Sequence, residues 1–166
     1  MEFTLEGIDS SQVEKSLNTS FPVISSRRNP LIKRLRSLAS KKGREHYSML
    51  LLEGTHLLLE ALKSSITPSE IVATSFWIDN HQALYKSISS KTSFSEVTDD
   101  ALKAALTTQN PDGVASVFPL EGLPLLPESS DFILVLDRIQ DPGNLGTIFR
   151  TALAAEVGMV LLIAGA

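Results

Sequence analysis

The chain has 166 residues, 43% of them hydrophobic, with no cysteine and a formal net charge of −4. This hydrophobic share is enough for a packed core, but no apolar run approaches the ~20 residues that span a membrane, so we expect neither disorder nor a membrane span. The lack of cysteine and the scattered positions of the three histidines predict no disulfide and no metal site, and they suit a reducing compartment, which we expect to be the cytoplasm.

The basic charge is concentrated between Arg27 and His46. This segment holds eight Lys and Arg residues and one acidic residue (+7), whereas the rest of the chain holds seven basic and eighteen acidic residues (−11). Residues 1–22, which precede it, are polar and lack a clear period, and we expect them to form a poorly ordered leader. A basic segment on an acidic protein steers a polyanion to one face and discourages non-specific binding elsewhere.

Within the basic segment, Asn29 followed by Pro30 predicts a helix start, because Asn is a good N-cap and Pro fits the first helical position. Gly43 is the predicted end of this helix. Its apolar stripe consists of Leu31, Leu35, Leu38 and Ala39. Such a pattern is usually a solvated amphipathic helix, and phosphate contact is the alternative that the charge favours. The candidate phosphate-binding residues are Arg27, Arg28, Lys33, Arg34, Arg36 and Arg44.

Short strands and short helices alternate through the middle of the chain. The predicted strands are 48–53, 70–78, 93–97 and 114–118. The predicted helices are 56–63, 81–87 and 100–106, with caps at Thr55, at Asp79 or Asn80, and at Thr98 with Asp99. This alternation predicts a layered α/β domain over about residues 23–119. Residues 120–130 contain two prolines, a glycine and two serines, which predicts an interdomain linker.

Residues 131–166 have the pattern strand, loop, helix, strand. An apolar run from Phe132 to Leu136 is followed by a polar loop, after which the apolar period becomes that of a helix. The helical stripe consists of Leu145, Ile148, Phe149, Ala152 and Leu153. Gly158 is the predicted end of the helix, and a second apolar run, Met159 to Ile163, follows. This is a βαβ unit, whose two strands run parallel.

The start of this helix is a candidate ligand site. Ligands bind outside the carboxyl ends of parallel strands, and Asn144 stands where an N-cap is expected. On a helical wheel Asn144, Thr147 and Arg150 lie on the face away from the apolar stripe, with Arg150 roughly 9 Å further along. These side chains suit an anionic, hydroxyl-bearing substrate. The alternative is ordinary turn and cap chemistry beside one solvated arginine.

Residues 141–152, DPGNLGTIFRTA, resemble the first signature motif of the SpoU-type RNA ribose 2′-O-methyltransferases of the SPOUT superfamily. The matching positions are Asp141, Gly143, Asn144, Gly146, Arg150 and Ala152. The resemblance implies catalytic roles for Asn144 and Arg150, S-adenosylmethionine as the methyl donor, and a knotted domain that binds it through two later motifs. Those motifs are missing before Ala166. We therefore expect a chain cut inside that domain, inactive alone, with the cofactor-binding residues beyond Ala166.

The basic segment and the strand and helix after it also resemble the RNA-binding domain of this family. The similar stretches are Asn29 to Lys33, Arg44, and Leu52 to Gly54 followed by a helix. The resemblance implies an α/β fold in which a small RNA-binding domain precedes the first βαβ unit of a truncated knotted methyltransferase domain. It also implies a structured RNA, tRNA or rRNA, as partner. The whole protein is expected to be a homodimer and the fragment a monomer.

Two other functional classes stay open. A nucleotide-binding α/β enzyme is one, because strand, glycine loop and helix begin a Rossmann unit, but the full GxGxxG and the acidic ribose ligand about 20 residues on are missing. A non-catalytic RNA-binding module is the other. Gly143 to Gly146 also satisfies the GXXG of a KH domain, although a strand rather than a helix precedes it.

Overall fold

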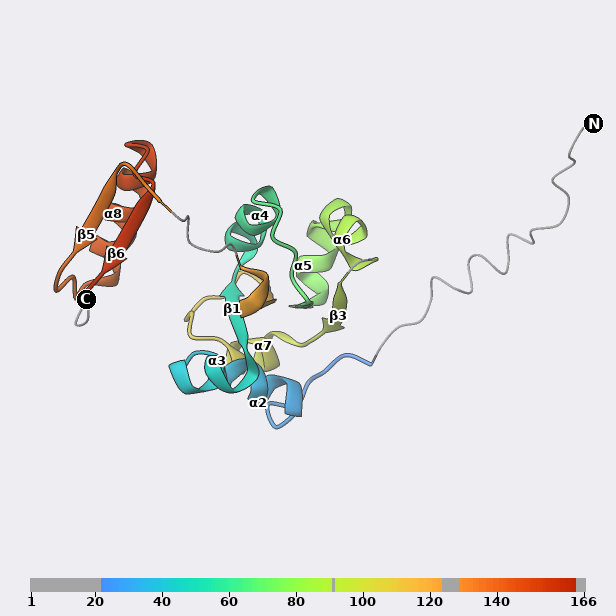
Figure 1. Ribbon diagram of the computed structural model, residues 1–166. Helices are drawn as coiled ribbons and strands as arrows, with labels where there is room; N and C mark the ends of the chain where they lie inside the picture. Colours follow the sequence, from blue (N-terminus) through green and yellow to red (C-terminus); the bar gives the residue numbers. More distant parts are fainter. Residues whose placement is uncertain (1–21, 91, 124–128, 164–166) are drawn as a thin grey trace, which may run out of the picture. The chain divides into compact units, whose positions relative to one another are not determined.

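The computed structural model of the protein describes residues 22–163, apart from residue 91 and residues 124–128. The chain divides into two compact units, and the boundary falls between Leu123 and Pro124. We call them unit 1 and unit 2 and describe each by itself (Figure 1). The predicted leader, except for Pro22, and five residues of the predicted linker lie outside the described residues.

Unit 1 is built on a mixed four-stranded sheet with the strand order β1-β4-β2-β3. The strands are β1 (Met49–Glu53), β2 (Glu70–Ala73), β3 (Ser93–Glu96) and β4 (Val114–Pro119). β4 pairs antiparallel with β1 and with β2, and β2 pairs parallel with β3. A parallel pair needs a crossover connection, which two helices supply between β2 and β3. The α/β class predicted for this part of the chain is confirmed.

Helices cover both faces of this sheet. They are α2 (Pro30–Ser37), α3 (Lys41–Tyr47), α4 (Thr55–Lys63), α5 (Ser75–Asn80), α6 (Gln82–Ser89) and α7 (Asp99–Ala105), and a 3-10 turn, η1 (Leu120–Gly122), follows β4. On one face, Leu35 of α2 belongs to the same buried cluster as Val117 of β4. On the other, Leu58 of α4 and Trp77 of α5 form a cluster with Val114 of β4. Successive residues of a strand point to opposite faces, so β4 contributes to both clusters.

The prediction of one strand over residues 70–78 is wrong. β2 ends at Ala73, and α5 begins directly after Thr74. The Thr74 hydroxyl accepts a hydrogen bond from the Trp77 amide at 3.2 Å and so caps the helix. The apolar and aromatic residues that suggested a strand therefore continue the core as a helix, and Trp77 is 1% exposed.

The predicted helix caps have mixed outcomes. Thr98 caps α7 as predicted, through its side-chain oxygen. Neither Asp79 nor Asn80 caps α6, because both belong to α5, and α6 begins without a side-chain cap. Thr55 is the first residue of α4 and not its cap. Its amide donates to Oδ2 of Asp112 at 2.7 Å. A carboxylate 57 residues further on thus accepts from an N–H group that has no partner within the helix.

The prediction that Gly43 ends a single basic helix is wrong. α2 ends at Ser37, and a second helix, α3, begins after Ser40, whose side chain accepts a hydrogen bond from the Gly43 amide at 3.1 Å. A Cβ atom on Gly43 would lie 1.9 Å from the carbonyl oxygen of Ser37. Glycine is therefore needed because α3 touches the end of α2. The buried face of α2 also differs from the prediction, since Ile32 is buried and Ala39 is exposed.

Unit 2 is a βαβ unit, as predicted. It consists of β5 (Ile133–Leu136), α8 (Pro142–Ala154) and β6 (Met159–Leu162), and the two strands pair in parallel. α8 buries Ala152, whereas Leu153 is 79% exposed. Large apolar side chains in and beside the strands are 41–53% exposed, namely Phe132, Ile133, Val135, Leu161, Leu162 and Ile163. One helix thus covers only part of the apolar surface of this sheet.

The helix of unit 2 ends before the predicted Gly158. α8 stops at Ala154, and Glu156 takes a left-handed φ of 56°. The Val157 amide donates to the Ala152 carbonyl at 2.9 Å, and the Glu156 amide donates to the Leu153 carbonyl at 3.1 Å. This is a Schellman motif formed without glycine. Throughout the described ranges, no helix is long and apolar enough to cross a membrane.

Candidate functional site

The start of α8 is capped by Asp141. Its Oδ1 accepts a hydrogen bond from the Asn144 amide at 2.9 Å, and Pro142 occupies the first helical position. The prediction that Asn144 is the N-cap is therefore wrong: Asp is an equally good cap, and Pro at the first position fixes the helix start. As a consequence, the side-chain amide of Asn144 does not cap the helix. It lies exposed on the first turn.

Thr147 holds the side chain of Arg150. Arg150 Nη2 donates to Thr147 Oγ1 at 3.2 Å, and the Thr147 hydroxyl donates to the carbonyl oxygen of Gly143 at 3.0 Å. These bonds draw the guanidinium back towards the first turn of α8. A Cβ atom on Gly146 would lie 3.8 Å from Arg150 Nη1, which is an ordinary contact. The structure therefore brings Arg150 and Thr147 together, and Asn144 lies one turn before Thr147 on the same face.

These three side chains offer an amide, a hydroxyl and a guanidinium on one exposed helix face. A guanidinium stays protonated at neutral pH and binds phosphate through two parallel N–H groups. The amide supplies both a donor and an acceptor for a sugar hydroxyl. The arrangement can therefore fix a phosphate and orient a neighbouring hydroxyl group, but its arginine cannot serve as a general base.

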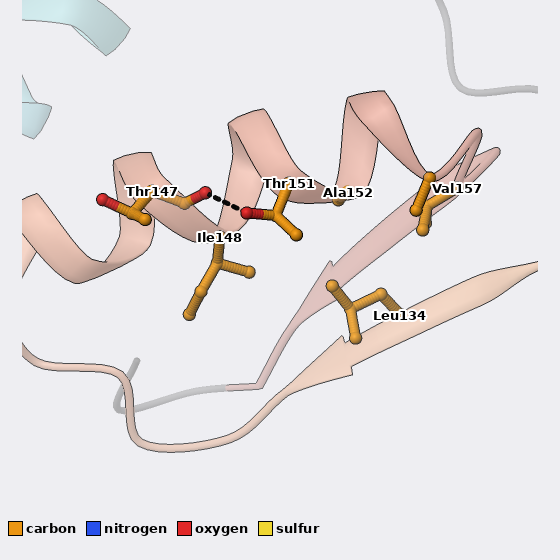
Figure 2. Close-up of a pocket in the computed structure, with 7 residues that line it drawn as sticks. Leu134, Thr147, Ile148, Thr151, Ala152 and Val157 are labelled. Atoms are coloured by element: carbon orange, nitrogen blue, oxygen red, sulfur yellow. Dashed lines mark hydrogen bonds between the residues drawn. The ribbon is translucent and has the colours of Figure 1, made fainter.

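An apolar hollow of about 280 Å³ opens beside this helix, between α8 and β5 (Figure 2). Its lining residues are Leu134, Thr147, Ile148, Thr151, Ala152, Ala155 and Val157. The Thr151 hydroxyl donates to the Thr147 carbonyl oxygen at 3.0 Å, the bond that Figure 2 draws as a dashed line. Because no charged side chain lines the hollow, it suits apolar packing and not a phosphate.

Two arginines of the basic segment are held by other parts of unit 1. Arg34 forms an ion pair with Glu70, and these side chains are only 28% and 14% exposed. Arg36 donates through Nε to the carbonyl oxygen of Ala104, near the end of α7. Carbonyl groups at the end of a helix carry negative partial charge, so a bound arginine stabilises them. Both arginines therefore tie α2 to its neighbours.

Arg44 has a similar role at the end of α2. Its Nη1 donates to the carbonyl oxygens of Leu38 at 3.1 Å and of Ala39 at 3.0 Å. Because Arg44 belongs to α3, these bonds fix α3 against the end of α2. Half of the predicted phosphate-binding residues thus already have acceptors within unit 1, namely Arg34, Arg36 and Arg44.

The other five basic residues form an exposed set on or beside α2 and α3, which we call the basic surface. They are Arg27, Arg28, Lys33, Lys41 and Lys42. Arg27 lies 3.6 Å from Asp100, and Lys41 lies 3.7 Å from Glu45. Exposed pairs of this kind contribute little and open readily. Lys41 and Lys42 were not among the predicted phosphate-binding residues, although both are exposed at the start of α3.

Another hollow, of about 240 Å³, lies at one end of the sheet of unit 1. It is lined by Glu53, Gly54, His56, Thr108, Asn110, Pro111 and Asp112. Glu53 accepts hydrogen bonds from the amides of Thr107 and Thr108, each at 2.9 Å. Burial works to raise the pKa of Glu53, but these hydrogen bonds outweigh it and hold the pKa below the usual value. With two carboxylates in its wall, this hollow does not suit a phosphate.

Comparison with known proteins identifies unit 1. The family model of the MRM3-like substrate binding domain matches residues 29–116, which is more than half of the chain. The chain belongs to this family. The resemblance to SpoU-type methyltransferases found in the sequence is thereby confirmed, because the relatives and the similar solved structures are RNA methyltransferases.

Relatives of the chain are methyltransferases of rRNA or tRNA. A protein of Synechocystis that is named as an uncharacterized tRNA/rRNA methyltransferase is 38% identical over 89% of this chain and 55% of the relative. The 23S rRNA (guanosine(2553)-2′-O)-methyltransferase of Bacillus subtilis is 33% identical over 84% of this chain and 53% of the relative. The chain thus spans about half the length of these two relatives.

Solved structures agree on the fold. The crystal structure of an RNA 2′-O ribose methyltransferase matches with a TM-score of 0.68 and 29% identity, over 86% of this chain and 56% of that one. An AdoMet-bound rRNA methyltransferase from Sinorhizobium meliloti matches with a TM-score of 0.64 and 30% identity, over 84% of this chain and 53% of that one. The predicted fold class, truncated relative to these enzymes, is therefore confirmed.

The structure does not support a KH-type loop at Gly143 to Gly146. In a KH domain the GXXG sequence is a loop between two helices. Here Gly143 and Gly146 both lie inside α8, which follows a strand. The same placement counts against a Rossmann phosphate loop, since such a loop puts its first glycines before the helix.

Proposed function

We propose that this protein methylates a ribose 2′-hydroxyl in tRNA or rRNA, using S-adenosylmethionine. Unit 1 binds the RNA and unit 2 supplies the first catalytic motif. The observation that carries the proposal is Arg150, which Thr147 holds on the exposed face of α8 inside the twelve-residue motif. The names of the relatives support RNA methylation in general, and the Bacillus subtilis relative is named for a 2′-O position.

In this proposal Arg150 binds the phosphate next to the target ribose. It also stabilises the negative charge that develops on the 2′-oxygen as its proton leaves. A protonated guanidinium cannot accept that proton, so the proton passes to a phosphate oxygen beside the ribose. Asn144 orients the ribose through its side-chain amide. Thr147 is assigned as a positioning residue, because its hydroxyl holds the Arg150 side chain.

S-adenosylmethionine supplies the methyl group when it is bound. Its binding motifs are expected after Ala166, as the sequence resemblance implies, and this proposal assigns no residue of the chain to it. The apolar hollow beside α8 has no charged group that fits the amino-acid part of the cofactor. The part of the chain described here therefore contributes the phosphate and ribose contacts.

RNA binding by unit 1 is assigned to the basic surface. Its five cations are exposed, whereas Arg34, Arg36 and Arg44 have acceptors within the unit. Each phosphate neutralised by a lysine or arginine releases bound counterions, so affinity falls steeply with salt. The homodimer and the cytoplasmic location expected from the sequence stay predictions.

The test uses the full-length protein and RNA from the same cell. Arg150→Ala is expected to lower methyl transfer at least 100-fold while RNA affinity changes little, because many phosphate contacts lie on unit 1. Arg150→Lys is expected to restore little, because lysine lacks the planar fork. Transfer is measured with radiolabelled methyl donor, and the product is digested with alkali. A 2′-O-methylated ribose resists that cleavage because the attacking hydroxyl is blocked.

Thr147 and Thr151 provide a matched pair of controls. Thr147→Val removes the hydroxyl that holds Arg150 and is expected to lower transfer about tenfold. Thr151→Val removes a hydroxyl bonded only to the helix backbone and is expected to leave transfer within about twofold. Normal transfer by Arg150→Ala, or a methylated product that alkali still cleaves, would contradict the proposed function.

A further inference from the structure

The last turn of α3 carries two neighbouring aromatic rings. The ring centroids of His46 and Tyr47 lie 4.6 Å apart, and the ring planes make an angle of 83°. His46 is exposed, and Tyr47 is 39% exposed. An edge-to-face pair does not cover both faces of both rings. Together with the exposed fractions of the two side chains, this leaves part of the aromatic surface accessible to a ligand.

These rings sit on a rigid part of unit 1. Gly43 lets α3 touch the end of α2, and Arg44 bonds the two carbonyls there. Directly after Tyr47, Ser48 takes a left-handed φ of 51° and ends the helix, and β1 begins at the next residue. The ring of Tyr47 is therefore attached between two fixed elements. A ligand that stacks on it does not have to order the backbone first.

Charge decides what kind of ligand fits. Lys42 and His46 are four residues apart in α3, so their side chains lie on the same face of the helix. Lys42 is exposed and belongs to the basic surface. Phe76 is the natural comparison, because it is a 74% exposed aromatic residue of unit 1. Its surroundings are acidic, with Asp79 in the same helix and Glu96 bonded to the adjacent Ser75. A polyanion is attracted to α3 and repelled from Phe76.

We propose that His46 and Tyr47 form a stacking site for an unpaired nucleotide of the bound RNA, whose phosphate Lys42 contacts. This inference rests on the proposed RNA-binding role of unit 1. Aromatic side chains stack on any base because every base has a flat face, whereas a base inside a duplex has both faces covered. The site would therefore select RNA in which a loop or bulge adjoins a helical stem, and it would not select one base over another.

The experiment compares two RNAs of equal length and charge, a hairpin with an unpaired loop and a fully paired duplex. Binding to the 166-residue chain is measured over a series of salt concentrations. The unchanged chain is expected to bind the hairpin more tightly. Tyr47→Ala is expected to weaken hairpin binding about tenfold, the size of one stacked base, with little change in duplex binding or in the salt slope. Lys42→Ala is expected to weaken binding to both RNAs and to reduce the salt slope by about one charge.

Three further variants sharpen the result. Tyr47→Phe keeps the ring and is expected to bind like the unchanged chain. Tyr47→Leu keeps apolar bulk but not the ring, so it is expected to lose the preference for the hairpin without loss of folding. Phe76→Ala is the matched control for loss of an exposed aromatic ring and is expected to change neither RNA affinity. The fluorescence of Trp77, the single tryptophan and a core residue of unit 1, verifies that each variant is folded.

The outcomes separate this inference from the function on which it rests. If the unchanged chain binds neither RNA at low salt, RNA binding by unit 1 is wrong and the stacking site is wrong with it. If the chain binds both RNAs equally, or if Tyr47→Ala behaves like Phe76→Ala, the stacking site alone is overturned. Loss of the hairpin preference in both Tyr47→Ala and Tyr47→Leu, but not in Tyr47→Phe, supports it.

Discussion

In unit 1 helices cover both faces of the sheet, whereas in unit 2 a single helix packs against two strands. Val72 and Val117 of unit 1 have no exposed surface, while Val135 and Leu161 of unit 2 are 53% and 41% exposed. The strands of both units are apolar in sequence, so composition does not cause this difference in exposure. The difference follows from the number of helices that pack against each sheet. The chain spans 53% and 56% of the length of the two solved structures compared above.

The polar side chains of the two units differ in the same way. In unit 1, Arg34 and Arg36 bond to groups 36 and 68 residues away in the sequence, so distant parts of the chain set their positions. In unit 2, Arg150 is held by Thr147, only three residues away in the same helix. The motif of α8 is thus defined locally, and unit 1 is defined by long-range contacts. Substitutions that remove one kind of support or the other test this difference.

The largest difference is expected between alanine substitutions at two helical glycines, one in each unit. Gly43→Ala puts a Cβ atom 1.9 Å from the Ser37 carbonyl oxygen, so α3 must move away from α2. We expect the free energy of unfolding of unit 1 to fall by about 3 kcal/mol, the upper range for overpacking. Gly146→Ala meets only the end of the Arg150 side chain, at 3.8 Å, and alanine favours a helix, so unit 2 is expected to keep or gain stability.

Urea unfolding followed by Trp77 fluorescence measures unit 1 by itself, because this tryptophan is the only one in the chain. The helical circular dichroism signal at low urea checks that α8 stays folded in Gly146→Ala. Equal unfolding midpoints for Gly43→Ala and the unchanged chain would show that α3 does not touch α2 as closely as described. The comparison between a tightly packed unit and an open one would then fail.

A smaller effect is expected from two neighbouring cations of α2. Arg34→Ala leaves Glu70, 14% exposed, without its partner, and is expected to lower the stability of unit 1 by about 1–2 kcal/mol. Lys33→Ala removes an exposed cation and is expected to change stability by less than about 0.5 kcal/mol. RNA binding should show the reverse order, since Lys33 belongs to the basic surface.

The measurement combines Trp77 fluorescence in urea with RNA binding at several salt concentrations. Lys33→Ala is expected to reduce the salt slope by about one charge, and Arg34→Met, which keeps the bulk of the side chain, is expected to leave it unchanged. If Arg34→Met reduced the slope as much as Lys33→Ala, Arg34 would be a phosphate contact after all. The division of the basic residues into structural and exposed ones would then be wrong.

The sequence was sufficient where the signal is local. The caps at Asn29 and Thr98 follow from the preference of these residues for helix starts, and both are present in the structure. The βαβ pattern of unit 2 and the shared helix face of Thr147 and Arg150 follow from apolar period and helical spacing. A prediction of this kind uses residues that are at most one or two helical turns apart.

The sequence was insufficient where a distant residue decides the outcome. At the start of α4 the Thr55 amide donates a hydrogen bond to Asp112, 57 residues further on, and no nearby residue indicates this partner. The same limit explains why Arg34 and Arg36 were predicted to bind phosphate, because their acceptors lie 36 and 68 residues away in the sequence. Gly43 was read as a helix end because glycine is common there. Its actual use, close contact with Ser37, depends on how two helices pack.

The smallest effect is expected from pH, at the carboxylate of Glu53. Hydrogen bonds from Thr107 and Thr108 hold its pKa below the usual value despite partial burial. A lowered pKa means that folding favours the ionised carboxylate. Its stabilisation is therefore fully present above about pH 4.3, where a free glutamate titrates, and it is lost as the pH falls through the lower folded-state pKa.

Glu53→Gln cannot ionise and should lose this part of the acid sensitivity of unit 1. Because Glu53 is partly exposed, the difference is expected to stay below about 1 kcal/mol. Trp77 fluorescence in urea at pH 7 and pH 3 measures it, and an identical pH dependence in the two proteins would mean that these bonds do not distinguish the folded from the unfolded carboxylate.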